Sequence, residues 1–67
     1  MDLVVNGEPR SVAPDAPTVD AVLAALGLPR ERVAVEVNGS IVTKAERVQH
    51  PVKDGDVLEV VTLVGGG

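Results

Sequence analysis

The dipeptide Asn-Gly occurs twice in the chain, as Asn6-Gly7 and as Asn38-Gly39, and each copy follows a short run rich in valine and precedes a second short run. Asn-Gly in this setting is the strongest local signal for a β-hairpin, because a two-residue type I′ turn needs a positive φ at both positions. Two hairpins in so short a chain restrict the fold to a small sheet built largely from neighbouring strands.

Five strands are predicted from the runs around these turns and near the end of the sequence. The first hairpin is predicted over residues 3–5 and 8–12, and the second over 33–37 and 41–42. The last strand is predicted over 57–64, where both faces are largely apolar. Such a strand is either central and covered on both sides, or it exposes a face for docking.

One amphipathic helix is predicted between the hairpins. Thr18 is a suitable N-cap, because its hydroxyl can accept a hydrogen bond from a free N–H group of the first turn. The apolar residues of the helix, spaced to share one face, are Val19, Val22, Leu23 and Leu26. Gly27 supplies a left-handed residue that ends a helix, and Pro29 prevents its continuation.

The predicted order is β-β-α-β-β-(turn)-β, with a single helical turn over 44–50 and a tight turn over 53–56 before the last strand. A hairpin, a helix across one face, a second hairpin and a last strand beside the first give an α+β mixed sheet of the β-grasp (ubiquitin-like) type. Since so short a helix cannot cover both faces, we expect one open face. We expect Val4, Val61 and Leu63 to lie on it and to contact partner proteins.

Composition narrows the functions open to the chain, which we expect to form one domain over residues 1–67. The chain has no cysteine for a disulfide or an iron–sulfur cluster. It has no Phe, Tyr or Trp for base stacking, and its ten acidic residues against six basic ones repel phosphates, so no nucleic-acid partner is expected. No apolar stretch is long enough for a bilayer, and no signal peptide is evident, so we expect no membrane contact and a cytoplasmic location.

Conventional catalytic groups are scarce. His50 has no cysteine to activate, and the serines of the chain are Ser11 and Ser40. Asp54 and Asp56 flank a glycine, but a calcium loop needs more oxygen ligands at regular spacing, so this segment predicts a β-turn. We therefore expect no catalytic residue, no metal site and no bound cofactor.

The sequence closes with Gly65, Gly66 and Gly67, which predict a flexible tail. One interpretation is a frayed end or a cloning remnant. The other is functional, because three residues without side chains extend roughly 10 Å and can enter a channel too narrow for other residues. They would deliver the α-carboxylate of Gly67. A carboxylate is a poor electrophile, so another protein must activate it, most simply as an acyl-adenylate made from ATP.

The ordered set of motifs resembles the sulfur carrier proteins of thiamine biosynthesis, the ThiS family, over the whole chain. The motifs are Asn6-Gly7, Thr18-Val19, Leu26-Gly27, Val35-Glu36-Val37-Asn38-Gly39, Ile41-Val42, Asp54-Gly55-Asp56 and the closing Gly66-Gly67. Gly65 stands where related proteins often have another small residue. The length is also typical of that family.

The resemblance implies a cycle in which the chain is a protein substrate and not an enzyme. An adenylating enzyme related to ubiquitin-activating enzymes (ThiF-like) forms an acyl-adenylate on Gly67. Sulfur from a persulfide donor displaces AMP and leaves a thiocarboxylate, and thiazole synthase (ThiG-like) accepts that sulfur. Gly66 keeps the tail slim. Two alternatives stay open: the small subunit of molybdopterin synthase or another sulfur carrier, and a non-catalytic β-grasp binding module.

Overall fold

The computed structural model describes residues 1–63, and both predicted hairpins are present in it. Strands β1 (Asp2–Val5) and β2 (Glu8–Ser11) pair antiparallel around the first Asn-Gly turn. Strands β3 (Val33–Val37) and β4 (Ser40–Val42) pair in the same way around the second. Both turns therefore form where the sequence predicts them.

The backbone of the two turns has the predicted left-handed geometry. Asn6 and Asn38 both have a φ of 51°, and Gly7 and Gly39 follow with φ values of 81° and 86°. Positive φ at both central positions matches the twist of a hairpin, and Asn and Gly tolerate it best.

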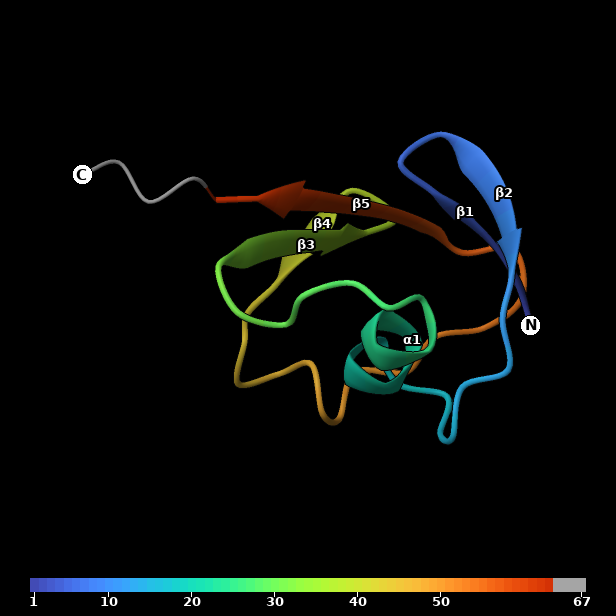
Figure 1. Cartoon of the computed structure of the whole chain (residues 1–67), viewed down its shortest axis with the longest axis horizontal. Helices are drawn as coiled ribbons and strands as arrows, with labels where there is room; N and C mark the ends of the chain where they lie inside the picture. The colour runs from blue at the N-terminus through green and yellow to red at the C-terminus, as the bar shows by residue number, and fades with distance from the viewer. Residues whose placement is uncertain (64–67) are drawn as a thin grey trace.

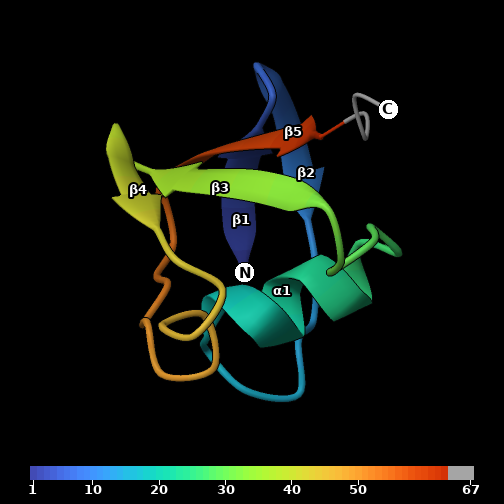
Figure 2. The same cartoon turned by 90° about the vertical axis from the view of Figure 1, so that its left-hand side faces the viewer.

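Strand β5 (Val57–Thr62) lies at the centre of the sheet, whose order is β2-β1-β5-β3-β4. It runs parallel to β1 and antiparallel to β3. Helix α1 (Val19–Ala25) and the long connection that follows β4 lie on one side of the sheet, and no helix crosses the other side within residues 1–63 (Figures 1 and 2). This is the predicted α+β β-grasp arrangement, with one helix on one face of a mixed sheet.

Strand β5 ends earlier than predicted, at Thr62 and not at Val64. Its antiparallel partner β3 begins at Val33, which lies opposite Thr62, so the ladder has no strand to continue on. Leu63 adds one further bond, because its N–H donates to the carbonyl of Arg32 at 2.6 Å. Val64 lies outside the described residues.

Both ends of α1 use the predicted capping residues. The Thr18 hydroxyl accepts a hydrogen bond from the Ala21 N–H at 3.3 Å. At the other end Gly27 has a φ of 71°, its N–H donates to the Ala24 carbonyl, and the Leu28 N–H donates to the Leu23 carbonyl. These two bonds form a Schellman motif.

Within residues 1–63, no helix is long and apolar enough to cross a bilayer.

Residues 44–49 form consecutive turns, where the sequence predicts a single helical turn over 44–50. Two bonds here have the spacing of a helix, since the Arg47 N–H donates to the Thr43 carbonyl and the His50 N–H to the Glu46 carbonyl. The carbonyls of Arg47 and His50 instead accept from the N–H groups of Asp20 and Val19 at the start of α1. Because those N–H groups have no partner inside the helix, this loop satisfies them.

Arg47 is also a buried cation that the sequence pattern did not indicate. Its side chain is only 4% exposed. The guanidinium donates to the carbonyl of Arg30 at 3.0 Å and to that of Val33 at 2.6 Å. It therefore fastens the connection after β4 to the start of β3.

The core lies between α1 and the sheet and is almost entirely aliphatic. Its buried residues are Leu3, Val5, Val19, Val22, Leu23, Val33, Val35, Val37, Val42, Val52, Leu58 and Val60. The predicted apolar face of α1 packs into this core: Val19, Val22 and Leu23 belong to the cluster, and Leu26 is half-buried against its margin.

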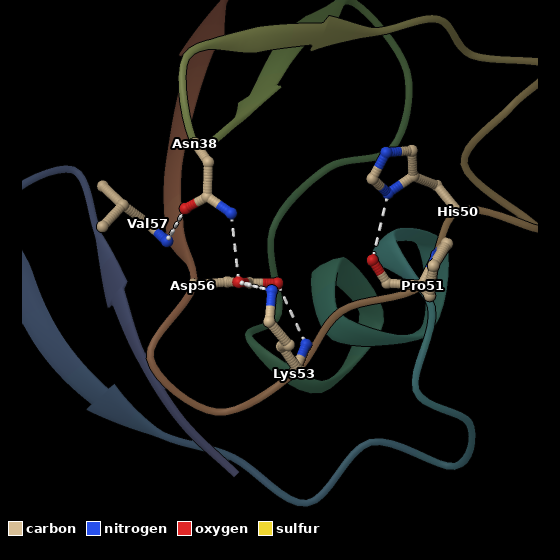
Figure 3. A network of polar contacts seen from close by, with 6 residues as sticks. All are labelled: Asn38, His50, Pro51, Lys53, Asp56 and Val57. Carbon is tan, nitrogen blue, oxygen red and sulfur yellow. Dashed lines mark hydrogen bonds and ion pairs between the residues drawn. The ribbon is translucent and has the colours of Figure 1, made fainter.

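A polar network fixes the start of β5 (Figure 3). The Asp56 carboxylate, buried at 4% exposure, accepts from the Lys53 N–H and ammonium, each at 3.0 Å, and from the Asn38 side-chain amide at 3.1 Å. The Asn38 amide oxygen accepts from the Val57 N–H at 2.9 Å. Burial raises the pKa of Asp56, but the donors from Lys53 and Asn38 outweigh it, so its pKa lies below the ordinary value.

From the packing of the core we expect a large loss of folding stability when either of the two fully buried leucines is truncated. Leu23→Ala or Leu58→Ala should lower the free energy of unfolding by about 2–5 kcal/mol, because each removes buried methyl groups and leaves a cavity. Urea denaturation followed by circular dichroism measures it. Val48→Ala, at a 59% exposed position, is the control and should change stability by less than about 0.5 kcal/mol. A leucine variant as stable as this control would contradict the packing described here.

Because of the Asp56 network, we expect the stability of the domain to fall as the pH is lowered into the acid range. The pKa of Asp56 is lower in the folded than in the unfolded state, so its contribution is present above the unfolded pKa of about 3.9 and is lost as pH falls through the folded pKa. Asp56→Asn should cost about 1–3 kcal/mol at neutral pH and flatten the acid limb of the stability curve. Asp15→Asn, in an exposed loop, should leave that limb unchanged. An unaltered acid limb in Asp56→Asn would show that the network does not carry it.

Candidate functional site

The predicted carrier tail, Gly65, Gly66 and Gly67, lies outside the described residues. The last described residue before it is Leu63, which directly follows the central strand. The described part of the candidate site is therefore the sheet surface next to the end of β5.

This surface is the side of the sheet that faces away from α1. Side chains alternate along a strand, so the buried Leu58 and Val60 point toward α1. The residues that alternate with them, Val57, Glu59 and Val61, point outward. Val57 is 41% exposed and Val61 is 56% exposed. The outward set on β5 is thus partly apolar and in contact with solvent.

Strand pairing extends this surface across the sheet, because residues opposite each other share a face. We define the open face as these outward residues and their partners: Val4, Ala34, Glu36, Ile41, Val57, Glu59 and Val61. Val4 lies opposite Val57, at the start of β5. Val61 lies opposite Ala34, at the end nearest Leu63. The two ends of the open face are therefore apolar.

The middle of the open face is acidic. Glu59 of β5 lies opposite Glu36 of β3, and Glu36 in turn lies opposite Ile41 of β4. Ile41 is 75% exposed, the most exposed of the large apolar side chains in the described region. Two carboxylates and one bare isoleucine thus form a row across the sheet, between the two apolar ends.

The structure places the three predicted contact residues in two groups. Val61 and Leu63 are exposed near the end of β5. Val4 is half-buried beside Val57 at the other end, and the row of Glu36 and Glu59 separates it from Val61. Whether any of them contacts a partner stays a prediction.

Sequence reasoning missed the acidic row and Ile41 as members of this surface. The alternation along 57–64 is enough to place Val57 on the same side as Val61. Ile41 could have been found from its position next to Val42, which is buried, since neighbours in a strand face opposite ways. The approach of Glu36 to Glu59 depends on the register between distant strands, which no local pattern indicates.

The Asn6 side chain holds β5 in place where β1 turns away. Its amide oxygen accepts from the Val60 N–H at 2.7 Å, and its amide nitrogen donates to the Val60 carbonyl at 3.0 Å. Asn6 thus continues the β1–β5 ladder with a side chain. This contact keeps the outward residues of β5 at the centre of the open face.

A hollow of about 590 Å³ lies between the segment that follows α1 and residues 44–48, and no residue of the open face lines it. Its lining includes two ion pairs, Arg30 with Asp20 and Lys44 with Glu31. These charges compensate one another within the hollow. His50 lies elsewhere on this side, half-buried, with its Nδ1 3.1 Å from the Pro51 carbonyl oxygen (Figure 3).

Comparison with known proteins places this architecture in a family. Residues 3–67 match the ThiS family. The sulfur carrier protein ThiS of Thermus thermophilus is 40% identical over 63 residues, which cover 94% of this chain and 95% of that protein. The crystal structure of a thiamine biosynthesis protein (ThiS) from Geobacter metallireducens superimposes with a TM-score of 0.82 at 38% identity, over 100% of both chains.

Longer relatives are similar as well. A thiazole synthase of Paramagnetospirillum magneticum is 48% identical over 67 residues, and one of Magnetococcus marinus is 36% identical over 67 residues. The chain spans 20% of the length of each. The family match extends over nearly the whole chain, and the fold is the same as that of the Geobacter metallireducens ThiS structure at 38% sequence identity. This chain therefore belongs to the ThiS family.

Proposed function

We propose that the chain is a sulfur carrier that delivers sulfur, as a C-terminal thiocarboxylate, for thiazole formation in thiamine biosynthesis. The observation that carries this proposal is the similarity to the Thermus thermophilus sulfur carrier, which extends over nearly the full length of both proteins. The fold supports it, because the central strand β5 ends at Thr62 and the glycine segment begins shortly after it in the sequence, at Gly65. The cytoplasmic location is part of the same proposal.

The reactive group is the α-carboxylate of Gly67, in a chain that ends there. A carboxylate of this kind is ionised at neutral pH and does not react with nucleophiles as it stands. An adenylating enzyme transfers AMP from ATP to this carboxylate and releases pyrophosphate. A persulfide sulfur of the donor then attacks the acyl carbon and displaces AMP. Cleavage of the S–S bond by a thiol leaves the thiocarboxylate on Gly67 and a disulfide on the donor side.

The domain itself supplies recognition and reach in this cycle. Gly65 and Gly66 lack side chains and so can pass through a narrow channel to the active site of a partner. The chain is the substrate of the adenylating enzyme and does not need catalytic side chains of its own. ATP is bound and consumed by that enzyme.

Thiazole synthase is the proposed acceptor of the sulfur. Two relatives named thiazole synthase contain a stretch similar to this entire chain, within proteins about five times as long. In those proteins a carrier-like domain is covalently joined to the rest of the thiazole synthase. That arrangement supports a direct contact between the two functions.

The open face predicts a variant that folds but docks poorly. Val61→Lys places a charge at the exposed apolar end of the face, so affinity for the adenylating enzyme and for thiazole synthase should fall at least about tenfold. Val48→Lys, at a similarly exposed valine in the 44–50 connection, is the matched control and should bind normally. Isothermal titration calorimetry measures the affinity of each variant for the two enzymes, and thermal melting shows whether each variant is folded. If Val61→Lys bound both enzymes as tightly as the wild type does, the end of the open face around Val61 would not be part of the docking surface.

The tail predicts two failures with different causes. Deleting Gly67 leaves a carboxylate but shortens the reach by about 3.5 Å, and reacting atoms must approach to about 3–3.5 Å, so adenylation should be abolished. Adding residues after Gly67 converts its carboxyl group to an amide, which ATP cannot adenylate. ATP–pyrophosphate exchange with the cognate adenylating enzyme measures both variants.

Thermal melting is the control for the tail variants, whose midpoints should match the wild type because the core residues of the described region, from Leu3 to Val60, all precede the tail in the sequence. Exchange by the extended protein, with its intact mass unchanged, would show that the Gly67 carboxylate is not the substrate. The carrier proposal would then be wrong.

A further inference from the structure

The two carboxylates at the centre of the open face lie in an unfavourable arrangement for the isolated domain. Glu36 and Glu59 are directly opposite each other on β3 and β5. Side chains in such a pair start about 4.5–5.5 Å apart at Cβ, and like charges there destabilise a sheet. The domain therefore carries a cost for keeping both acids in register.

The described part of the chain does not neutralise this pair. The ion pairs within residues 1–63 join Arg30 to Asp20, Lys44 to Glu31 and Lys53 to Asp56. The buried Arg47 donates to backbone carbonyls on the α1 side. Glu36 and Glu59 thus present two uncompensated negative charges at the centre of the open face.

The apolar neighbours determine what can cover these charges. Val57, Val61 and Ile41 surround the acidic row and are between 41% and 75% exposed. A protein that buried these three side chains would also remove water from both carboxylates. Burying an unpaired carboxylate is costly, so such a partner must supply a cation in return.

Arginine fits this position best. Its planar guanidinium presents several donors and can bond two carboxylates at once, and it loses less hydration energy than an ammonium group on burial. The net charge of −4 on this chain also favours encounter with a basic surface.

We propose that Glu36 and Glu59 together form the recognition site for an arginine on the carrier-docking surface of thiazole synthase, with Val57, Val61 and Ile41 buried around it. The proposal rests on the function proposed above. Thiazole synthase is the occupant because two relatives of that name contain a domain like this one in the same polypeptide. The adenylating enzyme is the alternative occupant that the experiment distinguishes.

The test is a double substitution with a charge-matched control. Glu36→Gln/Glu59→Gln removes two charges from the open face. Glu8→Gln/Asp15→Asn removes two charges elsewhere, since Glu8 lies opposite the buried Val5 on the other side of the sheet and Asp15 is in an exposed loop. Affinity of the full chain for the cognate thiazole synthase is titrated at low and high salt, and each protein is also melted thermally.

We expect Glu36→Gln/Glu59→Gln to bind thiazole synthase about tenfold more weakly at low salt, with a reduced salt dependence. Its melting midpoint should rise by about 1–5 °C, because the like-charge repulsion is gone. The control should bind within about twofold of the wild type. Affinity for the adenylating enzyme is titrated with the same variants, because that enzyme is the alternative partner of the acidic pair.

Three results would overturn the inference. Wild-type affinity and salt dependence in Glu36→Gln/Glu59→Gln, while the wild type binds and transfers sulfur, would overturn it alone and leave the carrier function intact. A loss confined to the adenylating enzyme would assign the acidic pair to that partner instead. No binding of the wild-type chain to thiazole synthase would overturn both the inference and the proposed acceptor.

Discussion

The position of β5 between β1 and β3 is the constraint on which the rest of the molecule depends. Its register on both edges decides which side chains enter the core and which reach the open face. A slip of one residue would turn Leu58 and Val60 outward and place Glu59 beneath α1. Both the stability of the domain and the composition of its candidate docking surface therefore follow from the same pairing.

Three polar side chains, and not the hairpins alone, hold that register. Asn6 and Asn38 supply the left-handed turns, and their amide groups also bond the backbone of β5, at Val60 and at Val57. Asp56 binds Asn38 from the residue just before β5. Each hairpin is thus tied at its turn to the central strand, which compensates for the absence of a disulfide in this small domain.

The features predictable from sequence were those set by local chemistry. The turns at Asn6 and Asn38, the cap at Thr18 and the end of α1 at Gly27 each depend on a few neighbouring residues. The early end of β5 and the buried Arg47 depend on contacts between distant segments, so no local pattern contained them. The same applies to the candidate site: exposure of Val61 followed from alternation, whereas the Glu36–Glu59 row required the β3–β5 register.

The division of β5 into two faces also bears on how a carrier can serve two enzymes in turn. One short helix covers only one side of the sheet, so the other side is available for recognition without any rearrangement of the core. If the adenylating enzyme and thiazole synthase both contact the open face, as proposed, they exclude each other, and the carrier must dissociate from one before it reaches the other. Rapid exchange favours a surface of modest apolar area with charges that steer association. A row of two carboxylates between small apolar ends suits that demand better than a continuous hydrophobic patch, which would bind both enzymes more tightly and also promote self-association.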